Sequence, residues 1–262
     1  MPRITRHLRD FTELVLPSGC VSCGCWISQV ARIGAAGAGH AGGDMVCASC
    51  RSGLREPSWP RCPRCAYPRG TGRHDGPDCR ACRDWPSALR AAHSAVVLRS
   101  PASELVHALK YQGWDGLADF MGRRMARAFA SDRSADFPSG SRQVVVPVPT
   151  TERRVRERGY NQAALLAERV GRDLRIPVRA GLVRVPGGPS QTALRPEARR
   201  ENVRGVFRVA SASVVDAHVL LVDDVLTTGA TAGEAATVLQ ASGAATVVLL
   251  TFARALQDLS GG

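Results

Sequence analysis

The sequence has no long hydrophobic run. Its longest uncharged apolar stretches, at residues 144–148, 219–222 and 247–252, span only a few residues, whereas a helix that crosses a bilayer needs about 20. Residues 14–16 are too short for the core of a secretion signal, and no small-residue cleavage site accompanies them. We therefore expect a cytoplasmic protein that does not insert into a membrane.

Lysine is almost absent, and aromatic residues make up only 5% of the chain. Of the 35 basic residues, 34 are arginines and Lys110 is the single lysine; with 23 acidic residues the formal net charge is +12. The excess is concentrated in residues 151–204, which carry 13 basic and 6 acidic side chains. Because the arginine fork suits phosphate groups, this segment favours a phosphorylated partner.

Cysteine is absent after residue 82, and this absence divides the chain in two. The first part holds all nine cysteines and lacks sustained helical or strand periodicity. Later, apolar strands predicted at 94–98, 143–148, 205–209, 218–222 and 246–252 alternate with helices predicted at 101–110, 161–174, with an interruption at Gly171, and 231–240. That alternation is typical of an α/β domain around a mostly parallel sheet. We predict a cysteine-rich module at 1–88 and an α/β domain at 89–262.

Eight cysteines form four repeats of Cys-x-x-Cys, namely Cys20, Cys23, Cys47, Cys50, Cys62, Cys65, Cys79 and Cys82. This spacing lets two thiolates bind one tetrahedral Zn²⁺ from a tight turn, so four pairs suffice for two sites. Redox pairs are the alternative, but a thioredoxin-like site needs a single pair on a βαβ unit. A closed four-cysteine site has no open coordination position, so the metal is expected to be structural, and Cys25 is left over.

The four cysteine pairs can combine into two metal sites in two ways. Pairing neighbours along the chain gives intervals of 23 and 13 residues within the sites, close to zinc-ribbon spacing. A cross-braced arrangement requires intervals of 38 and 28 residues. We favour the sequential pairing, which predicts a small double zinc-ribbon-like module, and leave the cross-braced one open.

Residues 219–231, Val-Leu-Leu-Val-Asp-Asp-Val-Leu-Thr-Thr-Gly-Ala-Thr, place two carboxylates and a Thr/Gly turn between an apolar strand and a helix. Ligands of open α/β sheets bind at the carboxyl ends of strands, and a helix start offers free N–H groups to a phosphate. Asp223 and Asp224 can accept hydrogen bonds from a sugar diol. Hydroxyl donors and close backbone approach come from the turn residues Thr227, Thr228, Gly229, Ala230 and Thr231. The pattern predicts a site for a ribose 5-phosphate.

A Walker B strand is the competing interpretation, because an apolar run that ends in Asp-Asp is also where NTPases hold Mg²⁺. That interpretation requires a Walker A loop, Gly-x4-Gly-Lys-Ser/Thr. Lys110, the only lysine, lies in Leu-Lys-Tyr-Gln-Gly at 109–113 and has no such pattern. The Walker B interpretation therefore fails on its partner motif.

Residues 219–231 resemble the phosphoribosyl pyrophosphate (PRPP) loop of type I phosphoribosyltransferases. The chain as a whole resembles the ComF family of competence-associated phosphoribosyltransferase-like proteins, which join an N-terminal cysteine zinc module to such a domain. The supporting blocks are Leu-Lys-Tyr-Gln-Gly at 109–113, Val-Pro-Val-Pro at 146–149, Arg-Glu-Arg-Gly-Tyr-Asn-Gln at 156–162 and the segment 191–205. The resemblance implies a type I phosphoribosyltransferase-like, mostly parallel sheet flanked by helices.

The resemblance also implies roles for individual residues. Asp223 and Asp224 would hold the ribose hydroxyls as the catalytic carboxylates, and the turn 227–231 would cradle the 5-phosphate. Residues 149–153 would stand at the position of the pyrophosphate loop, and 191–204 would form a flexible hood over it. Further candidate ligand contacts are Arg158, Asn161 and Arg200, for which a solvated surface role is the plain alternative.

Two functions follow from the resemblance. In the first, the chain is a phosphoribosyltransferase, a pentosyltransferase in which a nitrogen nucleophile displaces pyrophosphate from C1 of PRPP, or the reverse. Mg²⁺ would be held mainly by PRPP itself, and no recognisable nucleobase pocket names the acceptor. In the second, the chain is a non-catalytic PRPP sensor that binds single-stranded DNA and assists its uptake during natural transformation. The scarcity of aromatic stacking groups counts against the second function.

Overall fold

The computed structural model describes residues 19–27, 45–69, 79–132, 137–138, 140–185, 205–210 and 212–256. Four parallel strands form the main sheet in the order β1-β6-β5-β2. Their bounds are β1 Leu89–Val97, β2 Gln143–Pro147, β5 His218–Leu226 and β6 Thr246–Arg254. A separate antiparallel pair consists of β3 (Leu182–Arg184) and β4 (Phe207–Val209). The α/β class predicted from the sequence is confirmed.

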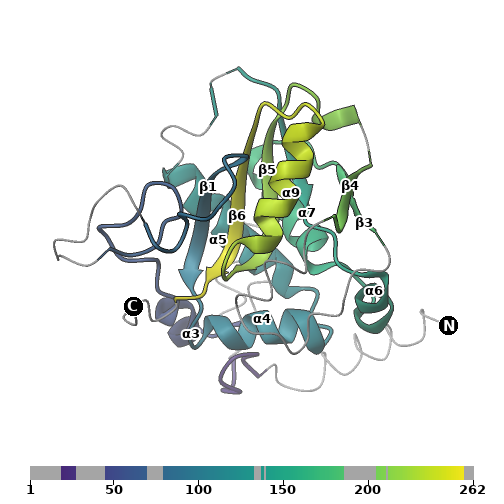
Figure 1. The fold of residues 1–262 in the computed structure, drawn as a ribbon. Coiled ribbons are helices and arrows are strands. Elements are labelled where there is room, and N and C mark those ends of the chain that lie inside the picture. The colour runs from purple at the N-terminus through teal and green to yellow at the C-terminus, as the bar shows by residue number, and fades with distance from the viewer. Residues whose placement is uncertain are drawn as a thin grey trace.

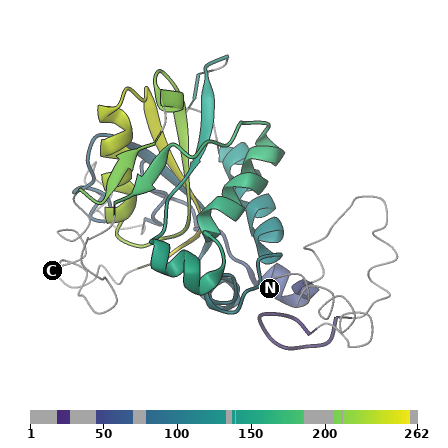
Figure 2. The ribbon, with the colours of Figure 1, turned by 90° about the vertical axis from the view of Figure 1, so that its right-hand side faces the viewer.

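Helices cover both faces of the main sheet (Figure 1). The helices are α3 Ala48–Gly53, α4 Ala102–Tyr111, α5 Leu117–Asp132, α6 Glu152–Arg158, α7 Gln162–Leu174 and α9 Ala230–Ala241, with a short 3-10 turn at Ala212–Val214. Figure 2 shows the sheet edge-on, with α9 on one side and α5 and α7 on the other. Below the carboxyl ends of the strands, α4 and α6 flank the edge where parallel strands present ligands (Figure 1).

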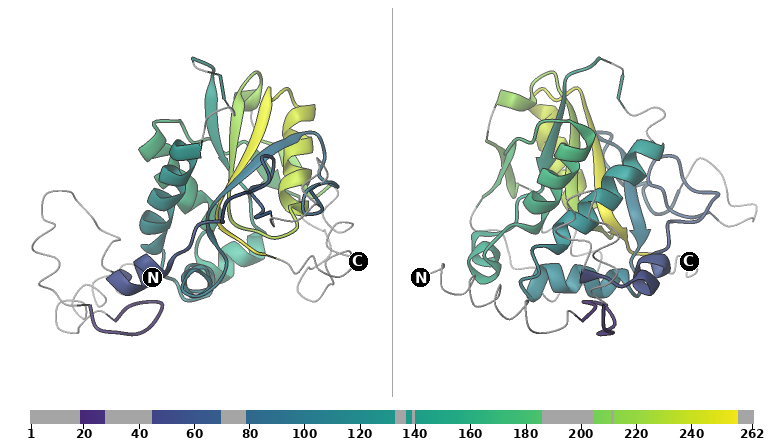
Figure 3. Two further views of the ribbon diagram at one scale, coloured as in Figure 1. Left: turned by 90° about the vertical axis from the view of Figure 1, so that its left-hand side faces the viewer. Right: turned by 180° about the vertical axis from the view of Figure 1, so that it is seen from behind.

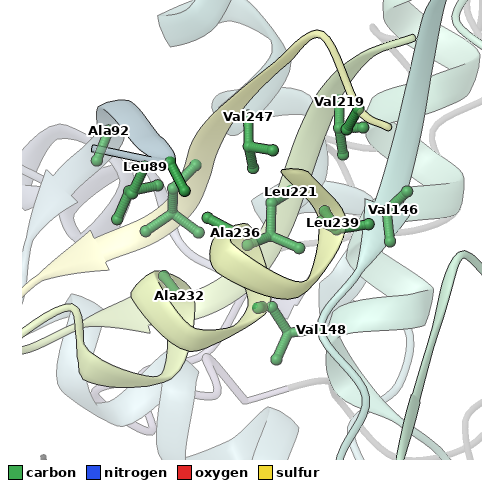
Figure 4. Packing of buried hydrophobic residues seen from close by; sticks show 14 of the residues in the cluster. Leu89, Ala92, Val146, Val148, Val219, Leu221, Ala232, Ala236, Leu239 and Val247 are labelled. Atoms are coloured by element: carbon green, nitrogen blue, oxygen red, sulfur yellow. The ribbon is translucent and has the colours of Figure 1, made fainter. Parts of the chain in front are cut away.

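The sheet strands are apolar on both faces because both faces are covered. On one face, small side chains of α9 lie close to strand residues, as Figure 4 shows for Ala232, Ala236, Val219, Leu221 and Val247. On the other face α4, α5 and α7 bury long side chains, among them Leu109, Met121 and Leu166. Both cores are formed by buried residues, so the sheet is a rigid support for the loops at its carboxyl edge.

The interruption predicted at Gly171 is wrong, because α7 runs through this residue to Leu174. A Cβ at position 171 would lie 2.5 Å from Val178 Cγ2 and 2.8 Å from the Ile176 carbonyl oxygen. The glycine therefore permits the chain to fold back over the helix. Two element starts also differ, because β1 begins at residue 89 and not 94 and β4 at 207 and not 205. Four elements were not predicted: α3, α5, α6 and β3.

The division at residue 88 stays a prediction. The strand β1 does begin at Leu89, yet Cys62, Cys65 and Cys82 share a buried core with the sheet. Within the described ranges, no helix has the length and apolar character that crossing a membrane requires.

Candidate functional site

The structure gathers the paired cysteines into two groups of four in sequential order. Cys20, Cys23, Cys47 and Cys50 form the first cluster, and Cys62, Cys65, Cys79 and Cys82 form the second; within each, the sulfur atoms lie within 4.8 Å of one another. A tetrahedral site with Zn–S bonds of about 2.3 Å requires sulfur atoms about 3.8 Å apart. The Sγ distances are 3.8 Å for Cys23–Cys47, 3.8 Å for Cys62–Cys82 and 3.7 Å for Cys65–Cys79. Both clusters can hold a structural metal ion, and their geometry is consistent with zinc.

The first cluster is organised by backbone N–H groups that point at sulfur. The N–H of Cys47 donates to Cys20 Sγ at 3.3 Å, and that of Cys50 donates to Cys47 Sγ at 3.4 Å. The Cys50 N–H lowers the pKa of Cys47 to about 6, which favours the thiolate that a metal needs. Hydrogen bonds to Cys23 and Cys47 raise the pKa of Cys25 to about 12. Cys25 lies beside the cluster but is not one of the four cysteines whose sulfur atoms converge.

A cationic side chain is buried against the second cluster. Arg254, the last residue of β6, is 1% exposed, and its Nη2 lies 3.8 Å from Cys65 Sγ. Its guanidinium also lies 5.1 Å from the centre of the Tyr67 ring. Burial lowers the pKa of Arg254 and the neighbouring cysteines raise it. Because four thiolates around a divalent ion leave a net negative charge, the buried guanidinium fits a metal-loaded cluster.

A cleft of about 470 Å³ lies at the carboxyl edge of the sheet. It brings together the predicted residues Asp223, Asp224, Thr227, Thr231 and Arg158. A second cavity of about 310 Å³ adjoins it around the turn and is lined by residues 227–232, with Asp223, Lys110 and Arg154 shared between the two. The cleft has two unlike walls: cationic side chains from α6 and β3, and largely uncharged ones beside and along α4.

The two carboxylates differ in their surroundings. Asp224 is 3% exposed, and its Oδ1 lies 2.7 Å from Lys110 Nζ, while its buried Oδ2 has no hydrogen-bond partner among the described residues. Asp223 is half-buried and accepts a hydrogen bond from the Asp224 N–H at 2.8 Å. Burial and the adjacent Asp224 raise the pKa of Asp223 to about 7. The pair therefore offers acceptor oxygens, one of them unsatisfied, to a ligand with hydroxyl groups.

The turn before α9 presents groups that can bind an anion. Gly229, with φ +82°, stands at the N-cap position of this 12-residue helix and supplies no side-chain cap, so N–H groups of the first turn beyond Ala230 stay available. The Thr228 hydroxyl accepts from the Ala230 N–H at 3.3 Å. Across the cleft Thr150, which follows β2, has a buried hydroxyl oxygen without a hydrogen-bond partner among the described residues. Both positions suit phosphate oxygens.

The remaining predicted residues have different positions. Arg158 lines the cleft, donates to Gln162 Oε1 at 2.8 Å and lies 4.9 Å from the centre of the Tyr111 ring. The Asn161 amide caps α7 by accepting from the Ala163 N–H at 3.1 Å, and its Nδ2 donates to the Val148 carbonyl at 3.1 Å. The structure thus gives Asn161 a local structural role. Arg200 and the predicted hood at 191–204 lie outside the described residues.

Several cleft residues were missed by sequence reasoning. Lys110 pairs with Asp224 across 114 positions of the sequence. Its position in the block 109–113 and its rarity in the composition were the available signals. Arg154, in the first turns of α6, and Arg184, at the end of β3, add charge to the wall that holds Arg158. These cationic residues come from elements whose juxtaposition no local pattern indicates.

The parallel sheet, the strand-turn-helix at its carboxyl edge and the paired cysteines define an α/β protein with two four-cysteine clusters that can each hold a metal ion. The chain belongs to the ComF family. It is 31% identical over 213 residues to DNA utilization protein YhgH of Salmonella typhi. The aligned residues cover 80% of this chain and 91% of that protein. It is 31% identical over 211 residues to competence protein ComFC of Bacillus subtilis, and these residues cover 78% of this chain and 82% of ComFC.

A further relative is competence protein F of Haemophilus influenzae, 28% identical over 220 residues, or 82% of this chain and 93% of that protein. No protein-family model matches the chain. Among solved structures, the glutamine PRPP amidotransferase of B. subtilis, complexed with ADP and GMP, matches 50% of this chain and 25% of its own, with 20% identity and a TM-score of 0.34. The family resemblance drawn from the sequence is confirmed by the curated relatives.

Proposed function

We propose that the protein binds PRPP, or a ribose 5-phosphate ligand, in the cleft and acts as a phosphoribosyltransferase. The observation that carries this proposal is the convergence of two carboxylates, an uncapped helix start and a cationic wall on one cavity. Each group matches one part of PRPP: a diol, a 5-phosphate and a pyrophosphate. A site for a free nucleoside triphosphate is not favoured, because the described cleft has no Walker A lysine.

The ligand orientation follows from the chemistry of the lining. The 5-phosphate accepts hydrogen bonds from the turn 227–231, and the carboxylates of Asp223 and Asp224 accept from the ribose hydroxyls. Pyrophosphate lies along Thr150, Arg154 and Arg184, where positive charge neutralises the leaving group. Mg²⁺, carried mainly by PRPP, adds charge stabilisation of the same kind. As positive charge develops on the sugar, the adjacent carboxylates stabilise it.

The opposite wall is where an acceptor enters. The larger cavity continues past the carboxylates to Leu98, Ser103, Val106, His107 and Tyr111, none of which lines the smaller, phosphate-side cavity. In PRPP, C1 lies on the far side of the ribose from C5. An acceptor that attacks C1 therefore meets a surface of apolar and aromatic side chains, which suits a planar nitrogen heterocycle better than a highly charged one.

Calorimetric titration of PRPP with Mg²⁺ tests the binding site. We expect the double variant Asp223→Asn, Asp224→Asn to lose measurable binding while it remains folded, because the diol loses its charged acceptors. Asp216→Asn is the matched control: this aspartate is exposed, precedes β5 and has φ 56°, a conformation that asparagine tolerates. Undiminished affinity in the double variant would rule out the assignment of the ribose to these carboxylates.

A pyrophosphate-release assay with PRPP, Mg²⁺ and a panel of free bases tests catalysis. Wild-type chain should release pyrophosphate with at least one base, and the double variant should not. PRPP binding without turnover by any base would contradict the transferase and favour a PRPP sensor.

A role in DNA uptake is the second candidate function. It is supported by the names of the relatives, which are a DNA utilization protein and competence proteins, and by the net charge of +12. Backbone binding of single-stranded DNA releases counterions, so the affinity for a labelled oligonucleotide should fall with a log-log slope of about −0.7 per phosphate contacted. Competition by PRPP would indicate that DNA and PRPP share the cationic wall. Failure to bind DNA at low salt would exclude this role.

A further inference from the structure

The turn that faces the phosphate-side cavity rests on a tryptophan from the cysteine-rich part of the chain. Trp85 is 8% exposed, and its Nε1 donates to the Thr228 carbonyl oxygen at 2.8 Å. A Cβ added at Gly229 would lie 2.5 Å from Nε1 and 2.6 Å from Cε2 of the same indole. The glycine is thus required by the indole as well as by its φ of +82°. The turn and the indole pack without intervening space.

The contact controls the direction of one peptide group. Because the C=O and N–H of a trans peptide point in opposite directions, a Thr228 carbonyl held by the indole turns the Gly229 N–H away from Trp85. The turn separates two cavities: the phosphate-side cavity of about 310 Å³, and a groove of about 680 Å³ that is lined by Trp85 itself. The Gly229 N–H therefore points away from the groove, toward the side where the phosphate binds.

Trp85 is in turn held by the second cluster. The backbone N–H of Trp85 donates to the Cys82 carbonyl at 3.1 Å. Arg64 lies inside the Cys62–Cys65 turn, and its guanidinium donates to four carbonyls: Cys82 at 3.2 Å, Trp85 at 3.3 Å, Pro86 at 2.8 Å and Leu89 at 3.0 Å. The metal-ligand turn, the connection 82–89 and the indole are therefore one hydrogen-bonded unit.

We propose that Trp85 is a positioning residue through which the second cluster holds the phosphate-binding turn in its binding conformation, so that metal occupancy there raises the affinity for a 5-phosphate. This inference rests on the proposed function only in that the turn binds a phosphate. Among the residues that the structure describes, the first cluster has no such connection, since its segment packs with the core on the α4 and α5 side of the sheet.

The variant Trp85→Phe removes the indole donor and keeps an aromatic ring beside Gly229. We expect it to weaken ribose 5-phosphate binding about two- to tenfold in calorimetry, the effect of one lost hydrogen bond. Binding of inorganic pyrophosphate, which uses the cationic wall with Arg154 and Arg184, should not change. Trp59→Phe is the matched control, because Trp59 belongs to the same cysteine-rich segment but is 71% exposed. A change in tryptophan fluorescence on ribose 5-phosphate addition should persist in Trp59→Phe and be lost in Trp85→Phe.

Metal occupancy is tested with one partly accessible cysteine from each cluster. Cys79→Ser should lose one metal ion and weaken ribose 5-phosphate binding at least as much as Trp85→Phe, whereas Cys23→Ser should lose one metal ion and leave the affinity unchanged. If Cys79→Ser does not fold, Trp85→Phe alone decides. Equal affinities of wild type and Trp85→Phe for ribose 5-phosphate would overturn this inference and leave the proposed function intact. Absence of ribose 5-phosphate binding in the wild type would overturn both.

Discussion

The two cysteine clusters have the same spacing motif and occupy different physical environments. In the left view of Figure 3, α3 of the first cluster lies at the foot of α5, far from α9. Cys23 of this cluster is exposed. The second cluster buries three of its four cysteines in the core that joins α9 to the sheet. The first cluster therefore contributes one buried cysteine, Cys20, to the core on the α4 and α5 side of the sheet, and the second contributes three to the core on the α9 side.

The comparison shows that a cysteine cluster can contact more of the fold than its own loop. In the second cluster a buried arginine faces the sulfur atoms, and the chain leaving the last cysteine contacts the turn 227–231 through Trp85. In the first, the sulfur atoms receive N–H groups from their own segment. Loss of metal should therefore have local effects at one cluster and effects on the whole α/β domain at the other.

The largest expected effect comes from a matched pair of buried cysteines. Cys65→Ser should lower the free energy of unfolding by about 3–5 kcal/mol, because Arg254 is left as a buried charge without its partner. Cys20 is about as buried, at 3% exposed against 0% for Cys65. Cys20→Ser should nevertheless lose one metal ion and leave the α/β domain folded. Urea unfolding and elemental analysis measure both. Equal destabilisation by the two variants would break the distinction between the clusters.

A smaller effect is expected when the buried positive charge of Arg254 beside the second cluster is removed. Arg254→Met should weaken metal retention at the second cluster about ten- to a hundredfold, as loss of an outer-shell partner does in other metal sites. Arg51→Met, in α3 of the first cluster, is the control. Competition with a chelator that reports zinc release measures retention. Arg254→Met should show one site that releases zinc fast, and Arg51→Met should show two sites that release it slowly. Unchanged release from Arg254→Met would show that the guanidinium does not stabilise the loaded cluster.

The pH dependence of stability should separate the cleft from the clusters. The pKa of Asp223 is raised from 3.8 to about 7, so between these values the native carboxyl keeps a proton that the unfolded chain has released. Its contribution to stability is therefore present at about pH 4 and is lost as the pH rises through 7. The clusters behave oppositely, because acid protonates thiolates and releases metal. With excess zinc, wild type should lose stability relative to Asp223→Asn between pH 5 and 7, as followed by urea unfolding; parallel curves would contradict the raised pKa.

The smallest expected effect concerns a hydroxyl of the turn. Thr228→Val should weaken ribose 5-phosphate binding by about 0.5–1.5 kcal/mol, the contribution of one hydrogen bond, with both metal ions retained. Thr237→Val is the control, because this exposed threonine lies on α9, the helix that follows the turn, and its hydroxyl donates to the Gly233 carbonyl. Calorimetry should show weaker binding only for Thr228→Val.

Sequence reasoning succeeded where the signal is short in range. The Cys-x-x-Cys pairs and the 13 residues at 219–231 fix their own geometry, so the clusters and the strand-turn-helix were predictable. The helix α6 has no buried residue and β3 has three residues, so neither carries an apolar period. The contacts Lys110–Asp224 and Trp85–Thr228 join positions 114 and 143 residues apart. Such contacts depend on the packed fold, and no local pattern encodes them.

The strand order also constrains how the chain assembles during synthesis. The strand β6 lies between β1 and β5 in the sheet, although it follows both in the sequence. β1 therefore has no neighbour in the sheet until β6 emerges, and Arg254 reaches Cys65 only 189 residues after that cysteine was made. Contacts of such long sequence separation slow folding. A ribosome-bound chain can close the first cluster early, but the second cluster and the turn 227–231 reach their final environment together, after translation of β6.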